Sequence, residues 1–341
     1  MRKTKVIVNP YDHTENDYIK LQIRCIEQAG MEPVPQKGNR CAANFIVYNW
    51  YENMDCKGGA LLIRKLLMLN YYRFFRKKII WVMHNKHPHE AEDRYSLFIM
   101  KYLSKISNAI MILSDETVKS LQKINPDPQI MKKVYKVPLI SYESLVGTIE
   151  PKHCTDELSL LMFGRIQPYK CIELLIEAVN GSKYRDKLKI KIVGSSKDEK
   201  YVYKLKKIID DNQNIDLDPR FISLEELKEY ASRADAFALP MDTDSALNSS
   251  AVMMAFSLAR TVICPEIGTT KEIKNAKDFI YTYDYKNKQE HLLQLRKAIE
   301  HAYEERATLE KKGLLARENI RKHNSIKSVS LHFKEMFEDC K

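Results

Sequence analysis

The segment LLMFGRIQPYKCIELLIEAV, residues 160–179, decides the fold of this chain. An apolar run typical of a buried strand, Leu158 to Phe163, ends in a Gly-Arg turn, and an amphipathic helix follows from Ile172 to Asn180. A strand joined directly to a helix is the unit from which parallel sheets with crossover helices are built. Arg165 and Lys170 lie five residues apart in the turn. Their charge would stabilise the negative charge that develops on a departing diphosphate.

Short apolar runs alternate with helical patterns along the whole chain, which predicts an α/β fold with two doubly wound, Rossmann-like sheets. Ligands bind beyond the carboxyl ends of the strands in such sheets, so the loops that follow strands are the candidate sites. Further strands are expected at residues 5–8, 45–48, 79–83, 109–113, 134–137, 188–193, 236–239 and 261–264. Further helices are expected at residues 17–29, 59–76, 91–107, 116–124 after a cap at Ser114, 198–212, 224–232, 249–258 and from about residue 289 onward.

Composition places the chain among globular, intracellular proteins. Its 341 residues fit two domains, and 44% are apolar. No apolar run approaches the roughly 20 residues that cross a bilayer, and residues 1–13 lack the apolar middle of a signal peptide. Seven scattered cysteines, without a Cys-x-x-Cys pair, favour reduced thiols. We therefore expect a cytoplasmic protein, and its net charge of +11 favours anionic partners.

The Gly-Arg turn resembles the Gly-Arg-x4-Lys-Gly donor motif of family-4-type GT-B glycosyltransferases, with Cys171 in place of the last glycine. The likeness continues through Gly194, at the end of a strand, and Phe221, in a loop that the family places beside the nucleotide base. The resemblance implies two Rossmann-like domains facing a central cleft, and a hexosyl transfer from a nucleotide sugar, UDP- or GDP-linked. It implies no further cofactor and no metal. Gly164, Arg165 and Lys170 would bind the donor, the two cations acting in catalysis.

A loop of small polar residues opens the helix expected at residues 249–258. Backbone N–H groups at such a helix start suit a phosphate, and Asn248, Ser249 and Ser250 are the candidates, with simple N-capping as the alternative. The family usually carries two glutamates separated by seven residues here. Ala246 and Met254 stand at the matching positions, so the chain is a divergent member and the family's retaining outcome is in doubt.

Polar loops after strands of the first half supply candidates for the acceptor side. WVMHNKHPHE, residues 81–90, resembles a loop of some relatives, by which His84 would contact the sugar or the acceptor and accept a hydroxyl proton. A structural His84, or a zinc site with His87 and His89, are the alternatives. Further acceptor-binding candidates are Asn49, Trp50 and Glu52 in NWYEN, Asn85, and His13, beside Asp12, in the first loop. A core tryptophan and a solvated glutamate are equally open.

The segment from Leu61 to Lys78 reads as a basic amphipathic helix. Residues 57–105 hold eleven Lys or Arg and three acidic residues, a balance of 11 − 3 = +8. Such a helix suits an anionic membrane surface, or simply a solvated face. Nucleic acid is not expected, because no recognition motif accompanies the charge. With the family resemblance, the helix suggests a peripheral enzyme on the inner face of the cell membrane that extends a surface glycan on a polyprenyl carrier.

The expected organisation is an acceptor-side domain at residues 1–145, a linker at 146–157, a nucleotide-sugar domain at 158–320, and a helix at 321–341 that packs back on the first domain. Three other functions remain open at this point, and the first is a nucleic-acid-binding module, which would bind polyanions with a steep salt dependence. The other two keep the GT-B fold. One is a GT-B enzyme with another reaction, such as an epimerase or phosphorylase. The other is a catalytically silent partner protein that binds nucleotide sugars, which the missing glutamates suggest.

Overall fold

The computed structural model describes residues 3–12, 17–54, 58–84, 94–149, 152, 154–210 and 212–341. The chain forms two compact units. Unit 1 comprises Met1–Ile140 and Asn324–Lys341, and unit 2 comprises Ser141–His323. The chain thus passes from unit 1 to unit 2 after Ile140, ahead of the linker expected at residues 146–157, and returns after His323.

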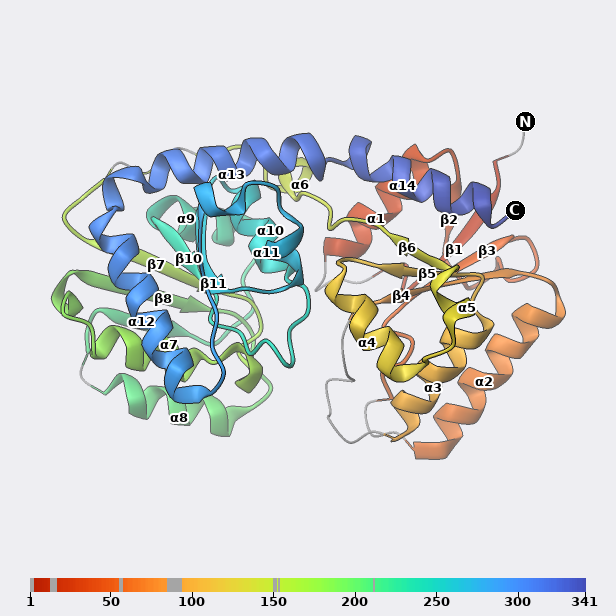
Figure 1. Ribbon diagram of the computed structural model, residues 1–341, viewed down its shortest axis with the longest axis horizontal. Helices are drawn as coiled ribbons and strands as arrows, with labels where there is room; N and C mark the ends of the chain where they lie inside the picture. Colours follow the sequence, from red (N-terminus) through yellow and green to blue (C-terminus); the bar gives the residue numbers. More distant parts are fainter. Residues whose placement is uncertain are drawn as a thin grey trace. The chain divides into compact units, whose positions relative to one another are not determined.

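Unit 1 is a parallel sheet of six strands in the order β2-β1-β3-β4-β5-β6. Helices α1 and α14 cover one face and α2, α3 and α4 cover the other (Figure 1). The strands are β1 (Lys5–Asn9), β2 (Glu32–Val34), β3 (Phe45–Asn49), β4 (Lys78–Met83), β5 (Ala109–Ile112) and β6 (Val134–Lys136). The helices are α1 (Asp17–Gln28), α2 (Gly58–Phe74), α3 (Arg94–Ile106), α4 (Glu116–Ile124), α5 (Pro128–Met131) and α14 (Ile326–Asp339).

Unit 2 repeats the architecture with the order β12-β11-β10-β7-β8-β9. Helices α7, α8 and α12 lie on one face and α9, α10 and α13 on the other (Figure 1). The strands are β7 (Leu158–Phe163), β8 (Leu188–Val193), β9 (Ile215–Asp218), β10 (Ala236–Ala238), β11 (Thr261–Pro265) and β12 (Ile280–Tyr283). The helices are α6 (Glu143–Val146), α7 (Ile172–Asn180), α8 (Glu199–Ile209), α9 (Leu224–Arg233), α10 (Ser250–Ser257), α11 (Gly268–Glu272), α12 (Lys288–Glu304) and α13 (Leu309–His323), with 3-10 turns η1 (Pro168–Lys170), η2 (Arg185–Lys187), η3 (Ala276–Asp278) and η4 (Arg306–Thr308).

The α/β fold expected from the sequence is confirmed. Central strands are apolar at nearly every position because helices cover both faces of each sheet: Val6, Ile7 and Val8 are all fully buried. None of the described helices is long and apolar enough to cross a membrane.

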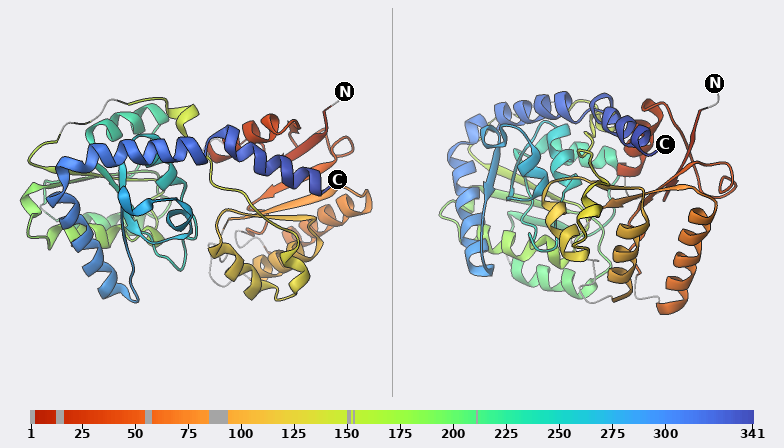
Figure 2. Two further views of the ribbon diagram at one scale, coloured as in Figure 1. Left: turned by 45° about the horizontal axis from the view of Figure 1, so that its top comes forward. Right: turned by 45° about the vertical axis from the view of Figure 1, so that its right-hand side comes forward.

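The last helix of the chain belongs to unit 1. α14 lies alongside α1 in both views of Figure 2. The Phe337 ring packs edge-on against Phe45 of β3, with the ring centroids 5.1 Å apart. The Cys25 thiol of α1 reaches the Ile326 carbonyl at 3.8 Å. The single helical tail expected from residue 289 is in fact three helices, α12, α13 and α14, separated by short breaks.

Three local expectations were wrong. The helix predicted at residues 198–212 ends at Ile209, where Asp210 takes a positive φ of 51°. The helix predicted at residues 59–76 ends at Phe74, because Arg76 adopts a left-handed conformation and the Lys77 N–H bonds back to the Tyr72 carbonyl, which closes the helix end. Asp115, not Ser114, precedes α4, and it makes no side-chain cap. The Ser114 hydroxyl instead pairs with that of Thr117 at 3.4 Å.

Candidate functional site

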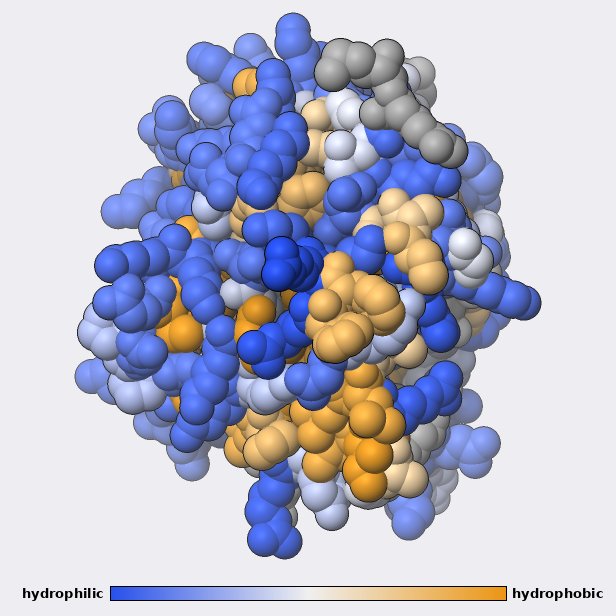
Figure 3. All heavy atoms as spheres, turned by 90° about the vertical axis from the view of Figure 1, so that its right-hand side faces the viewer, coloured by the Kyte–Doolittle hydropathy of each residue, from blue (hydrophilic) through white to orange (hydrophobic). Residues whose placement is uncertain are grey.

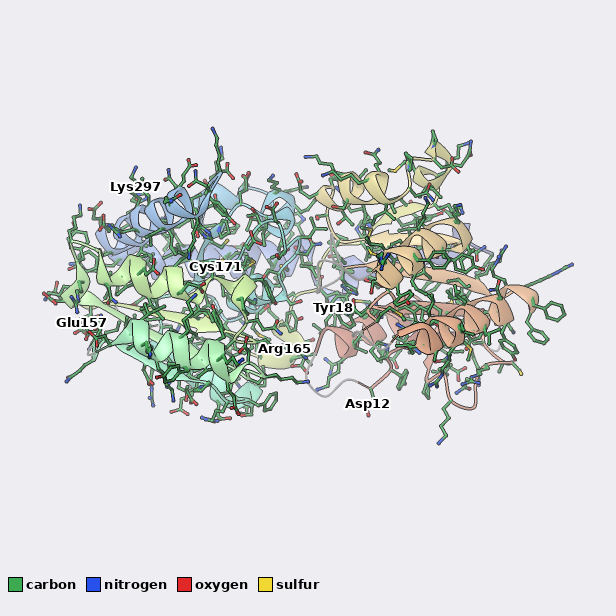
Figure 4. All side chains as sticks on the ribbon, turned by 90° about the horizontal axis from the view of Figure 1, so that it is seen from below. Asp12, Tyr18, Glu157, Arg165, Cys171 and Lys297 are labelled. Carbon is green, nitrogen blue, oxygen red and sulfur yellow. The ribbon has the colours of Figure 1, made fainter. Side chains whose placement is uncertain are left out.

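Two turns of unit 2 touch each other at the carboxyl edge of its sheet. Gly164 follows β7 and Gly194 follows β8, and both have a positive φ. A Cβ at Gly194 would lie 2.0 Å from the Gly164 carbonyl oxygen, so no side chain fits there. Figure 4 shows Arg165 at this edge, at the opposite end of β7 from Glu157. The turn therefore presents bare backbone and the exposed Arg165 at the edge where doubly wound sheets bind ligands.

Lys170 is a buried cation at the same edge. It ends η1 and is only 8% exposed. Its Nζ lies 4.0 Å from the point where a Cβ on Gly164 would stand, and over the Tyr169 ring at 5.4 Å from the centroid. Among the described residues, no oxygen accepts a hydrogen bond from this Nζ and no carboxylate pairs with it. An ammonium on a largely buried side chain, with no anion beside it in the described chain, is suited to an anionic ligand that reaches this edge.

Cys171, which stands where the family motif has glycine, starts α7 in a left-handed conformation with φ of 50°. Its N–H donates to the Pro168 carbonyl at 2.9 Å, which closes η1. The backbone therefore takes the shape that glycine favours, and the substitution leaves the turn intact.

The loop before α10 borders this turn, because the Asp242 N–H donates to the Tyr169 carbonyl at 2.8 Å. Ser249 caps α10: its hydroxyl accepts from the Val252 N–H at 3.4 Å, and its own N–H donates to Thr269 Oγ1 at 2.9 Å. Ser249 thus fulfils the capping alternative. Ser250 is exposed at the first turn of the helix.

Asn248 offers the more informative side chain of this loop. Its Oδ1 and Nδ2 atoms are both buried, and neither has a hydrogen-bond partner in the part of the chain that the structure describes. Buried amide groups are nearly always paired, so this one is suited to a polar ligand group. Ala246 and Met254, at the positions of the family's glutamates, are both buried and carry no carboxylate.

Phe221 follows β9 at the same edge of the unit 2 sheet. Its ring is exposed. The neighbouring Arg220 is held by Asp218 at 3.1 Å and by Glu226 at 2.7 Å, which fixes the loop between β9 and α9. An exposed ring on a braced loop is suited to stack against a planar base.

In unit 1, His84 and Asn49 meet at the carboxyl ends of β4 and β3. His84 Nε2 and Asn49 Oδ1 are 2.9 Å apart. The Trp50 ring stacks on the imidazole with centroids 4.3 Å apart and planes at 19°, and Tyr18 of α1 meets it edge-on at 5.3 Å. Trp50 is partly exposed, so the core tryptophan of this unit is instead Trp81, which is fully buried.

Two residues of this cluster differ from the sequence reading. Glu52, expected as a solvated side chain or a base, is buried: its Oε2 accepts from the Trp81 indole N–H at 3.1 Å. Burial raises the pKa of the Glu52 carboxyl, against smaller lowering contributions from its own backbone N–H, Trp81 and Lys65. Gln22 of α1, which the sequence did not single out, is fully buried and pairs with Asn49.

Some candidates lie outside the described residues: His13, Asn85, and the histidines at 87 and 89 of the zinc alternative. Asp12 is described and exposed. Within the described ranges, no group of three or more His, Cys, Asp or Glu side chains is placed to hold a metal ion.

Residues 150–314 match the family model described as glycosyl transferases group 1. Unit 2 carries a group 1 glycosyltransferase domain. The match includes the Gly164 turn, Lys170 and the Asn248 loop, so the residues gathered at this edge of the sheet belong to the domain that the family model describes. No curated protein matches the chain.

By its likeness to solved structures, the chain as a whole has the GT-B fold. HepE from Anabaena, solved with UDP and glucose, is 10% identical with a TM-score of 0.73, over 99% of this chain and 100% of that one. Sucrose-phosphate synthase from Thermosynechococcus elongatus is 13% identical with a TM-score of 0.74, over 99% and 98%. TarM from S. aureus is 17% identical with a TM-score of 0.61, over 86% of this chain and 55% of that one.

Proposed function

We propose that this protein is a glycosyltransferase that moves a hexose from a nucleotide sugar, UDP- or GDP-linked, to a glycan acceptor. The observation that carries the proposal is the buried Lys170, without an anionic partner in the described chain, beside the Gly164 turn of a group 1 domain. A diphosphate is the anion that this turn would receive. HepE, a protein with the same fold, was solved with UDP-glucose.

In the proposed reaction, an acceptor hydroxyl oxygen bonds to the anomeric carbon of the donor. The bond between that carbon and the diphosphate oxygen breaks, and its electron pair leaves with the nucleoside diphosphate. Arg165 and Lys170 stabilise the charge on that leaving group, which removes the need for a metal ion. His84 takes the proton of the acceptor hydroxyl. Phe221 stacks on the base.

The missing glutamates leave the sugar without a carboxylate partner from Ala246 or Met254. We propose that the buried amide of Asn248, whose two polar atoms lack partners among the described residues, hydrogen-bonds the donor instead. Ser250, which is exposed in the first turn of α10, would also contact the donor. The same substitutions favour a second candidate function, a protein that binds nucleotide sugars without transferring them.

The proposed acceptor is a growing polysaccharide on a polyprenyl carrier, with Asn49 and Trp50 on the acceptor side. The enzyme would then work at the inner face of the cell membrane. Support comes from the partly exposed Trp50, which lies beside His84 at the carboxyl edge of the unit 1 sheet, and from the net charge of +11, which favours an anionic surface.

The test is a screen of the purified protein against UDP-, GDP- and dTDP-sugars with EDTA present. Thermal stabilisation identifies the base, and release of nucleoside diphosphate in the presence of lipid-linked acceptors reports transfer. We expect stabilisation by one nucleotide family, and a turnover that falls about 10²-fold or more in Arg165→Ala. Binding without any release would support the silent protein. Absence of binding to every nucleotide sugar would refute both functions.

A further inference from the structure

Unit 1 exposes hydrophobic side chains over α2 and α3. Figure 3 shows hydrophobic residues gathered on this face among hydrophilic ones. Ile63, Leu67 and Phe74 of α2 are 60%, 66% and 80% exposed. We call the exposed set the α2–α3 surface, and it holds seven of the thirteen exposed large hydrophobic side chains of the described chain: Ile63, Leu67, Phe74, Phe75, Tyr95, Leu97 and Phe98.

The outward residues of α2 form a stripe that is separate from its core-facing side. Ile63, Leu67 and Phe74 are spaced four and seven residues apart, so they share one side of the helix. Leu69 and Tyr72 are buried and make the contact with the core. A surface helix of a soluble protein normally has polar residues on its outer side, and an exposed apolar patch usually marks an interaction site.

The charge on this surface has a single sign. Residues 58–78 and 94–106 contain nine Lys or Arg and no Asp or Glu. Two of the nine are engaged with backbone carbonyls: Lys65 with those of Tyr51 and Asn53 at 2.6 Å, and Lys77 with that of Cys41 at 2.7 Å. Exposed cations flank the apolar stripe: Arg64, Arg73, Arg76, Arg94, Lys101 and Lys105.

We propose that the α2–α3 surface docks on an anionic lipid bilayer. Its apolar side chains enter the boundary between headgroups and acyl chains, and its arginines meet the lipid phosphates. A partner protein is the less favoured occupant, because it would need an acidic surface to match the six exposed cations. The purpose of this docking, delivery of a lipid-linked acceptor, rests on the proposed function. The membrane binding itself does not.

The surface begins near the proposed acceptor residues. Helix α2 starts after the loop that carries Trp50 and Glu52, and α3 starts after the loop that follows β4 and His84. In a parallel sheet with crossover helices, the helix starts lie at the carboxyl edge of the sheet. Ile63 and Leu97, within the first two turns of their helices, therefore lie toward the edge that holds the His84 cluster.

The test is flotation of the full chain with vesicles of phosphatidylcholine alone or mixed with phosphatidylglycerol. We expect binding only to the anionic vesicles, weakened by salt. Leu67→Ser combined with Phe74→Ser, and separately Arg64→Glu combined with Arg73→Glu, should each lower the bound fraction at least tenfold. Leu331→Ser combined with Tyr203→Ser is the matched control, because these side chains are 64% and 61% exposed on α14 and α8.

Each outcome decides the proposal. Binding that is lost in the two α2 variants and kept in the control supports it. Equal binding by all variants, no binding by the wild type, or self-association that the α2 variants abolish would overturn it. Nucleotide-sugar stabilisation, measured on the same samples, reports the fold of each variant and tests the proposed function separately.

A second inference comes from an independent feature, the hydrogen-bonded side-chain amides of Asn49 and Gln22 next to His84. Asn49 Nδ2 donates to Gln22 Oε1 at 2.8 Å, and Gln22 Nε2 donates to Asn49 Oδ1 at 3.3 Å. Both residues are buried. The pair turns Asn49 Oδ1 toward His84 Nε2, and an oxygen without a hydrogen can only accept, so Nε2 must carry a proton. In the neutral imidazole, Nδ1 is then the unprotonated nitrogen.

We infer that Asn49 and Gln22 are positioning residues that fix His84 in the Nε2–H tautomer, so that Nδ1 is the atom that takes a proton. Only this last role rests on the proposed function. The tautomer is read from imidazole ¹⁵N chemical shifts of the full chain, with His84→Gln used for assignment. We expect Nε2–H in the wild type and in Asn49→Asp, which keeps an acceptor, and a mixture of tautomers in Asn49→Leu. Nδ1–H in the wild type, or no change in Asn49→Leu, would overturn the inference.

Discussion

At the scale of single residues, the most informative groups are polar atoms that are buried without protein partners. The Asn248 amide is such a group in the described part of unit 2, and Glu52 Oε1 is one in unit 1. Lys170 is related to them, because it is a largely buried residue whose ammonium has no acceptor among the described residues. Leaving a buried polar group unsatisfied costs about 1–3 kcal/mol, more if it is charged. Lys170 and Asn248 lie in loops at the carboxyl edge of the sheet, where a ligand can satisfy them. Glu52 is hydrogen-bonded to the buried Trp81, so its unsatisfied oxygen lowers the free energy of unfolding.

The Glu52 carboxyl should make stability depend on pH. Its pKa is raised in the folded protein above the ordinary value of 4.5. The folded chain therefore holds a proton that the unfolded chain releases, and stability falls as pH rises from about 4.5 until the folded carboxyl ionises. Glu52→Gln removes this loss and keeps an acceptor for the Trp81 N–H. Urea unfolding at several pH values should show the variant gaining on the wild type across this window.

A matched variant on the surface controls for the general effect of removing a charge. Glu338→Gln, on an exposed carboxylate of α14, should follow the wild-type profile. A Glu52→Gln curve parallel to that of the wild type at every pH would contradict the burial argument.

Residue-level sequence reading singled out Arg165 and Lys170, which the structure places at the carboxyl edge of the unit 2 sheet, but missed Gln22. Arg165 and Lys170 stand in one local motif, so their spacing was visible in the sequence. Gln22 acquires its role only through contact with Asn49, 27 residues away, and nothing in the helix pattern of α1 distinguishes it from a solvated glutamine. Ser249 was a candidate for phosphate because a cap and a phosphate site share one sequence pattern, and only the structure shows its N–H bonded to Thr269.

At the scale of elements, strands and helices with strong local signals were predicted closely. β7, β8 and α7 begin and end at the expected residues, because each combines an apolar run with a sharp stop. The short strands β2, β9 and β12 were not predicted. Each lies at a sheet edge and spans only three or four residues, so its signal in the sequence is short.

The contact between the turns after β7 and β8 gives a prediction at this scale. Gly194→Ala would push a Cβ to 2.0 Å from the Gly164 carbonyl oxygen, so the two turns must separate. We expect a loss of about 3 kcal/mol or more in the free energy of unfolding, together with weaker nucleotide-sugar binding. Chemical denaturation and the thermal shift with nucleotide sugar measure the two effects.

Gly147→Ala separates the steric clash from the cost of the backbone conformation. Gly147 also has a positive φ, of 66°, but nothing lies within 4 Å of the point where a Cβ on it would stand. Its backbone lies at φ 66° and ψ −147°, a region adopted almost only by glycine, so the substitution should cost about 1–3 kcal/mol through strain alone and leave nucleotide-sugar binding unchanged. Equal losses in the two variants would show that the turns after β7 and β8 are not in close contact.

At the scale of the whole molecule, two α/β units carry different chemistry at the same edge of their sheets. Unit 2 gathers cations and a buried amide, and unit 1 gathers an imidazole, an indole and an amide pair. The sequence predicted this division because the family motif lies in the second half. The α3 part of the α2–α3 surface was not predicted, because the exposure of Leu97 and Phe98 depends on how α3 packs against its neighbours.

The central claim is that the Gly164 turn of unit 2 binds the donor diphosphate through Lys170. Isothermal titration of the nucleoside diphosphate identified in the screen, with EDTA present, tests it most directly. We predict that Lys170→Ala weakens binding at least tenfold, a loss of about 1.4 kcal/mol or more, while Lys200→Ala, an exposed lysine on α8, binds like the wild type. Equal affinity of Lys170→Ala and the wild type would contradict the account.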